Sequence, residues 1–541
     1  MPSNNDQTNP PEERPITSDM LATAAEVTGL RFTAAERALM GQGVNDTLAH
    51  YQKLRQVQLD NSVAPALYFN PQPTAPADSP SSRATIDLSH RPPPPLPNDL
   101  EGLAFYPLAD LAELIRTRQV TATALTGMYL DRLKRYGPQL ECVITLTEEL
   151  ALAQAERADQ EIAAGHYRGP LHGIPWGAKD LLATKGIPTT WGAKPYQAQM
   201  IDIDATVVQR LAEAGAVLVA KLTMGALAWG DVWFGGQTKS PWNLGEGSSG
   251  SSAGSGAATA AGLVGFAIGT ETHGSIVSPS TRCGLSGLRP TFGRVSRYGA
   301  MALSWSMDKI GPMCRSVEDC ALVFNAIYGP DGHDPTVVKA PFVWPAEVDL
   351  AALRIGYLQS AFAEERDYQD HDQASLDQLA ALGASLIPLE LPDRYPVEAL
   401  ALCLQVEAAA AFDELTRSDQ DDQLVRQEEN AWPNRFRQAR LIPAVEYVQA
   451  NRIRSLIIQE MAHLMADIDL YLAPSSGPNL LLTNLTGHPA VVVPNGFADN
   501  GMPTSITFTG RLYDEARLLA VAQAYQAATD FHGRRPALSP G

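Results

Sequence analysis

Residues 247–256 read GSSGSSAGSG, and the small-residue segment that follows leads to residues 269–276, which read GTETHGSI. Runs of glycine and serine are usually flexible linkers. Here a helix-compatible run at 257–263 and an apolar, strand-like run at 264–268 follow directly. The stretch therefore enters packed structure, where small residues let elements approach closely and glycine lets backbone amides face a bound anion.

Three chemistries compete for this stretch. A phosphate-binding loop would need a lysine after the glycines, and none is present. Residues 250–254 match Gly-x-Ser-x-Gly, which would make Ser252 the nucleophile of an elbow between a strand and a helix. That elbow needs a strand immediately before it, and the proline, asparagine and glycines of 239–247 disfavour one. The third chemistry pairs two serines with a lysine.

Three elements of the sequence resemble the amidase signature family. Its long motif is recognisable over 250–290, ending in CGLSGLRP. An upstream element reads LHGIPWGAKD at 171–180, and a C-terminal element reads NLTGHPA at 484–490. The resemblance covers about 105–340 and 465–535, and several independent elements in the right order make coincidence improbable.

The resemblance implies a role for each matching residue. Lys179 corresponds to the catalytic lysine, Ser275 to the nucleophile and Ser251 to the bridging serine, with the separation 275 − 251 = 24 that the family keeps. It also implies a cis peptide between Gly250 and Ser251. Such a bond costs about 3–4 kcal/mol outside proline, so the fold must hold its geometry.

The proposed base must be uncharged to accept a proton. A lysine in water has a pKa of about 10.4, and burial without a carboxylate partner lowers that pKa. By residue type alone Lys179 would lie at the surface, and only its place in the motif reverses this expectation. We predict that Lys179 is buried beneath the glycine and serine backbone. Asp180 should point to the opposite face, because neighbours on an extended chain alternate.

By resemblance, the backbone amides of Thr272, His273, Gly274 and Ser275 form the oxyanion hole, in which losing one donor typically costs about 3–4 kcal/mol. The family commonly has glycine at the position of His273. Its imidazole is either packed beside the site or contacts the substrate. Glu271 stands where the family usually has aspartate, and we expect a supporting role for it.

The composition describes an ordinary globular protein of 541 residues with 45% apolar residues and a formal charge of −19. The negative charge argues against nucleic acid and anionic membranes as partners, and the low hydrophobicity of 247–270 argues against a membrane span. No signal peptide pattern is evident, so a cytoplasmic location is expected. The five cysteines lack C-x-x-C spacing and fit buried thiols in a reducing compartment: Cys142, Cys283, Cys314, Cys320 and Cys403.

The order of apolar runs and turns predicts an α/β fold with a large mixed, mainly parallel sheet flanked by helices on both faces, which is also the fold that the resemblance implies. Helices are expected at 108–118, 121–136, 147–164 and 514–531. Strands are expected at 216–220, 468–473 and 490–494.

The chain divides into an N-terminal extension at 1–104 and an amidase domain at 105–541. The extension begins with a disordered stretch, continues as a helical arm with a capping box at Thr33 and Glu36, and ends in a proline-rich strap. Residues 340–465 read as a variable helical region that, by resemblance, shapes the acyl pocket. Three tryptophans either line the approach to the site or serve as packing: Trp229, Trp233 and Trp242.

The predicted function is hydrolysis of a small-molecule carboxylic amide through an acyl-enzyme on Ser275, without metal or organic cofactor. An alternative from another class is the amidase-like subunit of a complex that converts glutamate on transfer RNA to glutamine. A third, a catalytically silent scaffold, is disfavoured because all three catalytic side chains are present. A homodimer stays an open alternative to a monomer.

Overall fold

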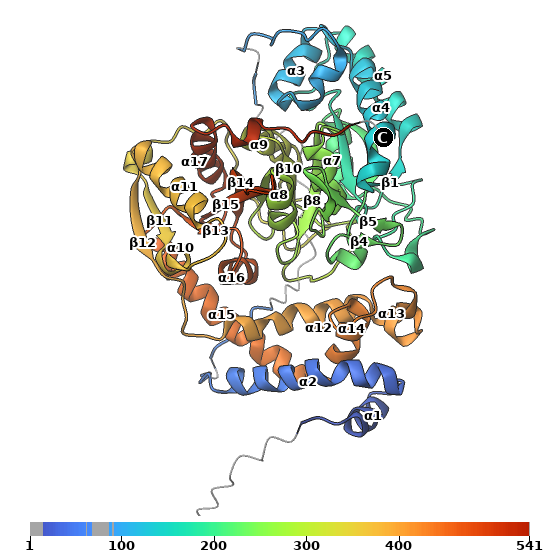
Figure 1. The fold of residues 1–541 in the computed structure, drawn as a ribbon, viewed down its shortest axis with the longest axis vertical. Helices are drawn as coiled ribbons and strands as arrows, with labels where there is room; N and C mark the ends of the chain where they lie inside the picture. Colours follow the sequence, from blue (N-terminus) through green and yellow to red (C-terminus); the bar gives the residue numbers. More distant parts are fainter. Residues whose placement is uncertain (1–14, 61, 68–85, 89–90, 540–541) are drawn as a thin grey trace, which may run out of the picture.

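The core of the molecule is a mixed sheet of eleven strands, flanked by helices (Figure 1). The computed structural model describes residues 15–60, 62–67, 86–88 and 91–539. In the order in which they pair, the strands are β1 (Val143–Leu146), β3 (Val217–Leu222), β2 (Pro175–Lys179), β8 (Phe266–Glu271), β10 (Lys309–Cys314), β9 (Ser286–Arg289), β14 (Ala490–Phe497), β15 (Pro503–Gly510), β13 (Leu470–Pro474), β11 (Arg354–Leu358) and β12 (Ser385–Leu389).

The large mixed sheet confirms the predicted fold class, but the expectation of a mainly parallel sheet is wrong. Of the ten pairings in the described part of this sheet, four are parallel: β2 with β3, β2 with β8, β11 with β12 and β11 with β13. The others are antiparallel. The hairpin of β14 and β15 shows the reason, because a short connection reverses the chain whereas a parallel neighbour needs a crossover.

Alternating side chains of the central strands feed two apolar layers. In β3, Leu218 packs into the cluster that holds α6, α9, α11 and α17, whereas Val217 and Val219 pack into the cluster of α4, α5 and α7. This period of two is expected for a strand buried on both faces. The helices involved are α4 (Ala122–Leu140), α5 (Glu148–Ala163), α6 (Thr206–Glu213), α7 (Ala253–Ala260), α9 (Val317–Ile327), α11 (Gln369–Ala381) and α17 (Glu515–Ala527).

Three of these helices, together with α3 (Leu108–Arg116), form where the sequence predicts helices, with ends shifted by a few residues. Another helix, α8 (Val277–Cys283), packs beside α7 and against β9, β14 and β15. α7 begins at Ala253, within the GSSGSSAGSG stretch, and α8 begins at Val277, directly after the GTETHGSI stretch. Both stretches therefore lead into helices that pack side by side.

The segment 340–465 contains more strand than its mainly helical expectation. It contains β11 and β12, which join the sheet at its edge and are connected through α10 (Gln359–Ala363) and α11. β12 lies at the edge of the sheet with largely exposed side chains, and Pro388 interrupts its apolar run at 386–389, which weakens the strand signal. The remainder is helical as predicted: α12 (Leu402–Ala411), α13 (Asp413–Arg417), α14 (Trp432–Ala439) and α15 (Ala444–Ala466).

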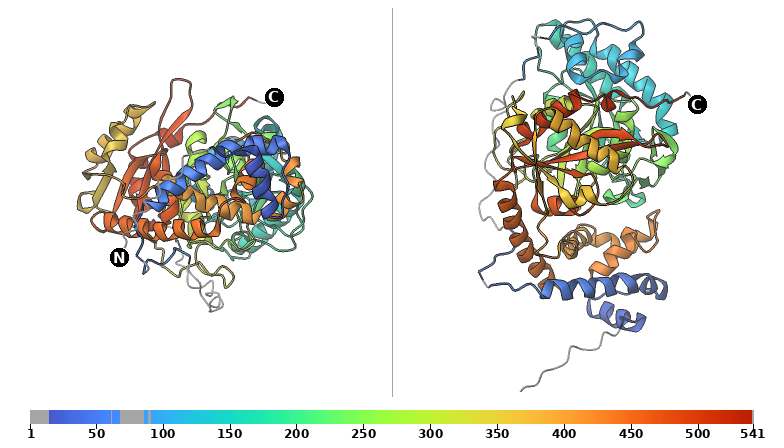
Figure 2. Two further views of the ribbon diagram at one scale, coloured as in Figure 1. Left: turned by 90° about the horizontal axis from the view of Figure 1, so that it is seen from below. Right: turned by 60° about the vertical axis from the view of Figure 1, so that its left-hand side comes forward.

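The helical arm of the N-terminal extension is present as α1 (Ser18–Val27) and α2 (Ala34–Arg55). The expected capping box is confirmed, since Thr33 Oγ1 accepts from Glu36 N at 3.3 Å and Glu36 Oε2 accepts from Thr33 N at 2.6 Å. Figures 1 and 2 show α2 lying alongside α14 and α15, away from the sheet. The predicted disordered start and most of the proline-rich strap lie outside the described residues.

The five cysteines are free and buried, as predicted. Within the described ranges, none of the helices combines the length and the apolar character that a membrane crossing requires.

Candidate active site

Lys179 is the last residue of β2, and its side chain is completely buried. Its Nζ lies 2.8 Å from Ser251 Oγ, 3.0 Å from Ser252 Oγ and 2.8 Å from Thr270 Oγ1. These partners are hydroxyl groups, which can donate to a neutral amine as well as accept from a charged one. Burial lowers the pKa of Lys179 to about 7, against a smaller opposing influence of Asp308 and Glu271. The predicted burial and lowered pKa are confirmed.

Asp180 has a partner of its own, and among the described residues no carboxylate forms an ion pair with Lys179. Its Oδ1 lies 2.9 Å from Lys221 Nζ on β3, and its Oδ2 accepts from Thr190 N at 2.8 Å. All of Asp180 and Lys221 is buried. Lys179 and Asp180 therefore point to opposite sides at the end of β2. Lys221 is paired with the carboxylate of Asp180, whereas Lys179 is bound by hydroxyl groups.

Ser252 occupies a different environment from the one an elbow nucleophile would need. A strand does precede it, β7 (Asn243–Gly247), but β7 pairs only with β6 (Lys239–Ser240) in a small ribbon, among the described residues. Ser252 is fully buried, and its Oγ donates to Thr270 O and accepts from Thr270 N, both at 3.1 Å. Its hydroxyl is thus engaged in structure rather than presented to a cavity.

The peptide between Gly250 and Ser251 is cis, as the resemblance implies. Gly250 is packed so closely that a Cβ there would lie 1.8 Å from the carbonyl oxygen of Gly230. Ser252 N donates to Ser275 O at 3.3 Å, which ties the serine stretch to the segment that carries Ser275. The sequence pattern GSSGSS is therefore needed here for close approach rather than for flexibility.

Ser275 opens onto a cavity of about 410 Å³. The cavity also touches Ser249, Gly250, Thr272 and His273, so it reaches both the serine stretch and the expected oxyanion segment. Gly274 adopts φ +86°, a backbone conformation that favours glycine. The remaining wall is mostly apolar and comes from several elements: Ala228, Trp229, Gly230, Leu303, Ala401, Leu404, Gln405, Trp432, Arg435 and Leu481.

His273 is exposed and lines this cavity, so its imidazole is presented to whatever fills it. Of the three tryptophans singled out, Trp229 lines the cavity and lies 4.7 Å from Trp432 between ring centroids. Trp233 packs on Phe234, and Trp242 donates from Nε1 to Cys283 O at 2.8 Å.

Glu271 shows what the supporting role of this carboxylate is. Its Oε2 accepts from the backbone N–H groups of Ile276 and Val277 at 2.9 Å, and its Oε1 lies 2.8 Å from both Arg289 Nη1 and Asn484 Nδ2. Burial raises its pKa, but Arg289 and these hydrogen bonds outweigh burial and bring the pKa to about 2. Glu271 therefore fixes the backbone that immediately follows Ser275.

Arg289→Met is expected to lower the free energy of unfolding by about 3–5 kcal/mol, because it leaves the buried Glu271 carboxylate without its counter-charge. Chemical denaturation of the purified variant measures this. The matched control is Arg282→Met, which breaks a half-exposed ion pair with Glu246 and should cost less than about 1 kcal/mol. Equal stability of the two variants would contradict the structural role assigned to the Glu271–Arg289 pair.

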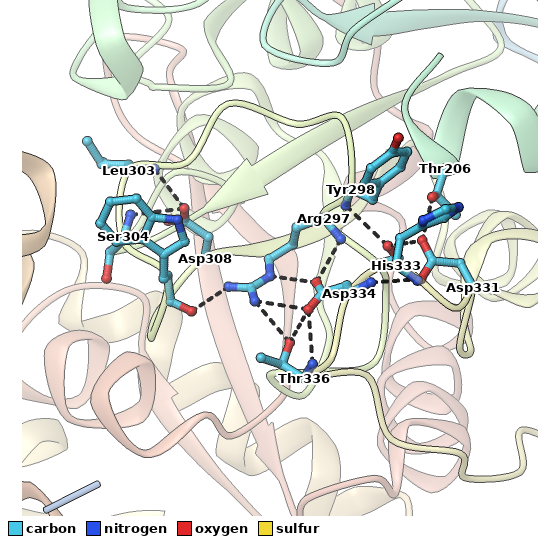
Figure 3. Close-up of polar contacts among 12 residues, drawn as sticks. Thr206, Arg297, Tyr298, Leu303, Ser304, Asp308, Asp331, His333, Asp334 and Thr336 are labelled. Carbon is cyan, nitrogen blue, oxygen red and sulfur yellow. Dashed lines mark hydrogen bonds and ion pairs between the residues drawn. The ribbon is translucent and has the colours of Figure 1, made fainter. Parts of the chain in front are cut away.

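A second cavity, of about 480 Å³, reaches the other side of the same segment through Thr270 and Thr272. Thr272 Oγ1 donates to the buried Asp308 Oδ1 at 2.5 Å, and Asp308 Oδ2 accepts from Leu303 N at 2.8 Å. Figure 3 shows Asp308 beside Leu303 and Ser304, while Arg297 faces Asp334 and Thr336 on the wall of this cavity. Asp308 therefore holds the expected oxyanion segment in place from the side of this second cavity.

The sequence reasoning missed Thr270 and Asp308. Thr270 stands within the quoted GTETHGSI stretch, but nothing in the sequence places it beside Lys179, because that contact depends on the pairing of β8 with β2. Nothing in the sequence around Asp308 indicates a role at the site, because its partner Thr272 is distant in the sequence and reaches it only in the folded chain.

Comparison with known proteins places the chain in a family. The sequence profile of the Amidase family matches residues 124–482. The chain belongs to the amidase family. A similar relative is the A subunit of the glutamyl-tRNA(Gln) amidotransferase of Methylococcus capsulatus, which is 35% identical over 479 residues, covering 80% of this chain and 98% of the relative.

Two solved structures of amidase-family proteins superpose on this chain. The native peptide amidase from Stenotrophomonas maltophilia does so with a TM-score of 0.70 at 30% identity, covering 82% of this chain and 99% of the other. The A subunit of the glutamyl-tRNA(Gln) amidotransferase from Thermotoga maritima gives a TM-score of 0.66 at 25% identity, covering 80% and 96%. The fold therefore matches both a peptide amidase and an amidotransferase subunit.

Proposed function

We propose that this chain cleaves a carboxylic amide through an acyl-enzyme on Ser275. The observation that carries the proposal is a buried, hydroxyl-bound lysine beneath a serine stretch that is tied by its backbone to Ser275, which opens onto a cavity. A serine hydroxyl is a weak nucleophile until a base takes its proton, and a lysine whose pKa is about 7 can be neutral at physiological pH. Ser251, 2.8 Å from Lys179 Nζ, is suited to relay that proton.

The proposed reaction has two halves. Ser275 Oγ bonds to the carbonyl carbon while its proton passes to Ser251 and the proton of Ser251 passes to Lys179. The C–N bond then breaks, and the departing nitrogen takes a proton back along the same path. Water next attacks the ester carbonyl and releases the carboxylic acid, with Ser275 regaining its proton. The amides of Thr272, His273, Gly274 and Ser275 would stabilise the oxyanion in both halves.

A second candidate is the amide-cleaving subunit of a complex that amidates glutamate on transfer RNA. The curated relatives favour it, since the amidotransferase sequences from Methylococcus and Methylobacillus match 80% of this chain at 35% and 33% identity. The cavity also fits glutamine, because Arg435 brings a positive charge to a mostly apolar wall and can face a carboxylate. In that role the ammonia released when Ser275 is acylated would pass to a partner protein.

Ammonia and amine release from purified protein tests the proposal and separates the two candidates. The substrates are glutamine, simple aliphatic and aromatic amides and C-terminally amidated peptides, with Ser275→Ala as the background control. Turnover by the isolated chain supports a stand-alone amidase. Turnover of glutamine that appears only with a copurified partner supports the amidotransferase role. Amide cleavage that persists at full rate in Ser275→Ala would contradict both.

A further inference from the structure

The N-terminal arm, residues 15–60 and 62–67, packs against the helices that form one wall of the cavity at Ser275. The family profile begins at residue 124, so the arm lies outside the part of the chain that matches it. Figures 1 and 2 show the layers in order: α1, then α2, then α14 and α15, then the sheet. The contacts of the arm with α14 and α15 connect it to the site.

The two sides of α14 have different neighbours. Trp432 and Arg435, three residues apart, line the cavity, and Trp432 Nε1 donates to Leu227 O at 3.0 Å. Asn434, Arg437 and Gln438 lie on the side that meets the arm. Residues three and four apart share a face of a helix, so α14 has one face on the cavity and one on α2.

The contacts between α2 and α14 are close and charged. Asn434 Nδ2 donates to Leu39 O at 3.0 Å, and Arg437 Nη2 lies 2.7 Å from Glu36 Oε1. Arg437 is buried and is also held by Asp421 at 2.9 Å. At Gly43 the helices approach so closely that an added Cβ would lie 2.3 Å from the side chain of Gln438.

The rest of the arm is fastened to α15 and its neighbours. Tyr51 and Leu54 are buried in one cluster with Leu400, Cys403 and Ile453. Beyond α2 the chain continues along α15, where Arg452 Nε donates to Val63 O, Ser455 Oγ donates to Ala64 O, both at 2.8 Å, and Ala66 N donates to Asn451 O at 2.9 Å. The arm is thus built into the structure along its described length after residue 33.

We propose that the N-terminal arm is a positioning element of the cavity at Ser275. It holds α14 at a fixed distance, and the close approach at Gly43 and the Glu36–Arg437 ion pair set where Trp432 and Arg435 stand. The arm touches neither Lys179, Ser251 nor Ser275 in the described contacts, so it acts on substrate binding rather than on bond cleavage. This inference rests on the proposed function wherever amide turnover is the readout.

The test compares Gly43→Leu with Gly41→Leu in the full chain. Both replace a glycine of α2 by a good helix former, but a Cβ at Gly41 would have no atom of the described residues within 4 Å. With a substrate that the wild type turns over, Gly43→Leu should raise KM by at least about fivefold and change kcat by less than about twofold. This is the pattern expected when binding that the ground state and the transition state share is lost. Gly41→Leu should match the wild type in both.

Hydrogen exchange of residues 431–440 supplies a readout that needs no turnover. It should be faster in Gly43→Leu than in Gly41→Leu. Should Gly43→Leu fail to fold, Glu36→Gln decides by the same readouts, because glutamine keeps the capping box but removes the charge facing Arg437. Unchanged KM and unchanged exchange in these variants would overturn the inference. A wild type without amide turnover would overturn the proposed function instead, and exchange would still decide whether the arm holds α14.

Discussion

Ser275→Ala is expected to lower kcat/KM for amide cleavage by at least about 10⁴-fold, because it removes the hydroxyl on which the proposed acyl-enzyme forms. Ser275 lines the cavity and belongs to the expected oxyanion segment, whereas the hydroxyl of Ser252 is hydrogen-bonded to the backbone of Thr270. The methyl side chain of alanine fits the same space, so the variant should fold with unchanged stability. Steady-state kinetics with the best amide substrate, together with thermal unfolding, measure both.

Ser252→Ala is the matched control for this prediction. It removes one hydroxyl from Lys179 and a backbone contact at Thr270, so it should reduce turnover by roughly 10²-fold at most and leave measurable activity. Full activity of Ser275→Ala together with complete loss in Ser252→Ala would favour the elbow mechanism at residues 250–254. That result would exclude Ser275 as the nucleophile.

Lys179→Met should lower kcat/KM by about 10³–10⁴-fold, because methionine fills the same buried space but takes no proton. The lysine lies in a completely buried position, so the apolar replacement should not lower the free energy of unfolding. Lys194→Met, at an exposed position, is the control and should leave kcat/KM unchanged. Wild-type kcat/KM in Lys179→Met would exclude the lysine as the base.

The pH dependence of the wild type follows from the same residue. Only the neutral amine can accept a proton, and burial brings the pKa of Lys179 to about 7. We therefore expect kcat/KM to rise about tenfold per pH unit below pH 7 and to level off above it. His273 also lines the cavity, so His273→Asn is the control: the acidic limb should stay near pH 7 in that variant. If the acidic limb is absent in His273→Asn, the group that titrates is the imidazole of His273 and not Lys179.

The fold could be predicted in outline because several of its elements carry local signals. The amphipathic pattern at 147–164 became α5, and the apolar run at 216–220 became β3, with ends displaced by one or two residues. Strand direction could not be predicted, since it depends on which strands meet after the chain has folded. β12 was missed for a local reason: Pro388 lies inside its short apolar run, and a proline within such a run argues against a strand.

The site was predicted from the motif rather than from residue chemistry. Nothing local distinguishes Lys179 from Lys221: both are buried lysines near strand ends, and only the fold gives one a carboxylate and the other hydroxyls. Thr270 and Asp308 are partners brought in from elsewhere in the chain, and such contacts leave no pattern in a single sequence. His273, by contrast, was visible as a departure from the family, and it lines the cavity.

The most direct test of the central claim is to trap the acyl-enzyme and locate it. The protein is mixed with a p-nitrophenyl ester or an activated amide, quenched in acid within the first turnover, digested and examined by mass spectrometry. We predict an acyl group on Ser275 in the wild type and its absence in Ser275→Ala. An acyl group on Ser252, or amide turnover with no acylated serine at any quench time, would contradict the Ser275 mechanism.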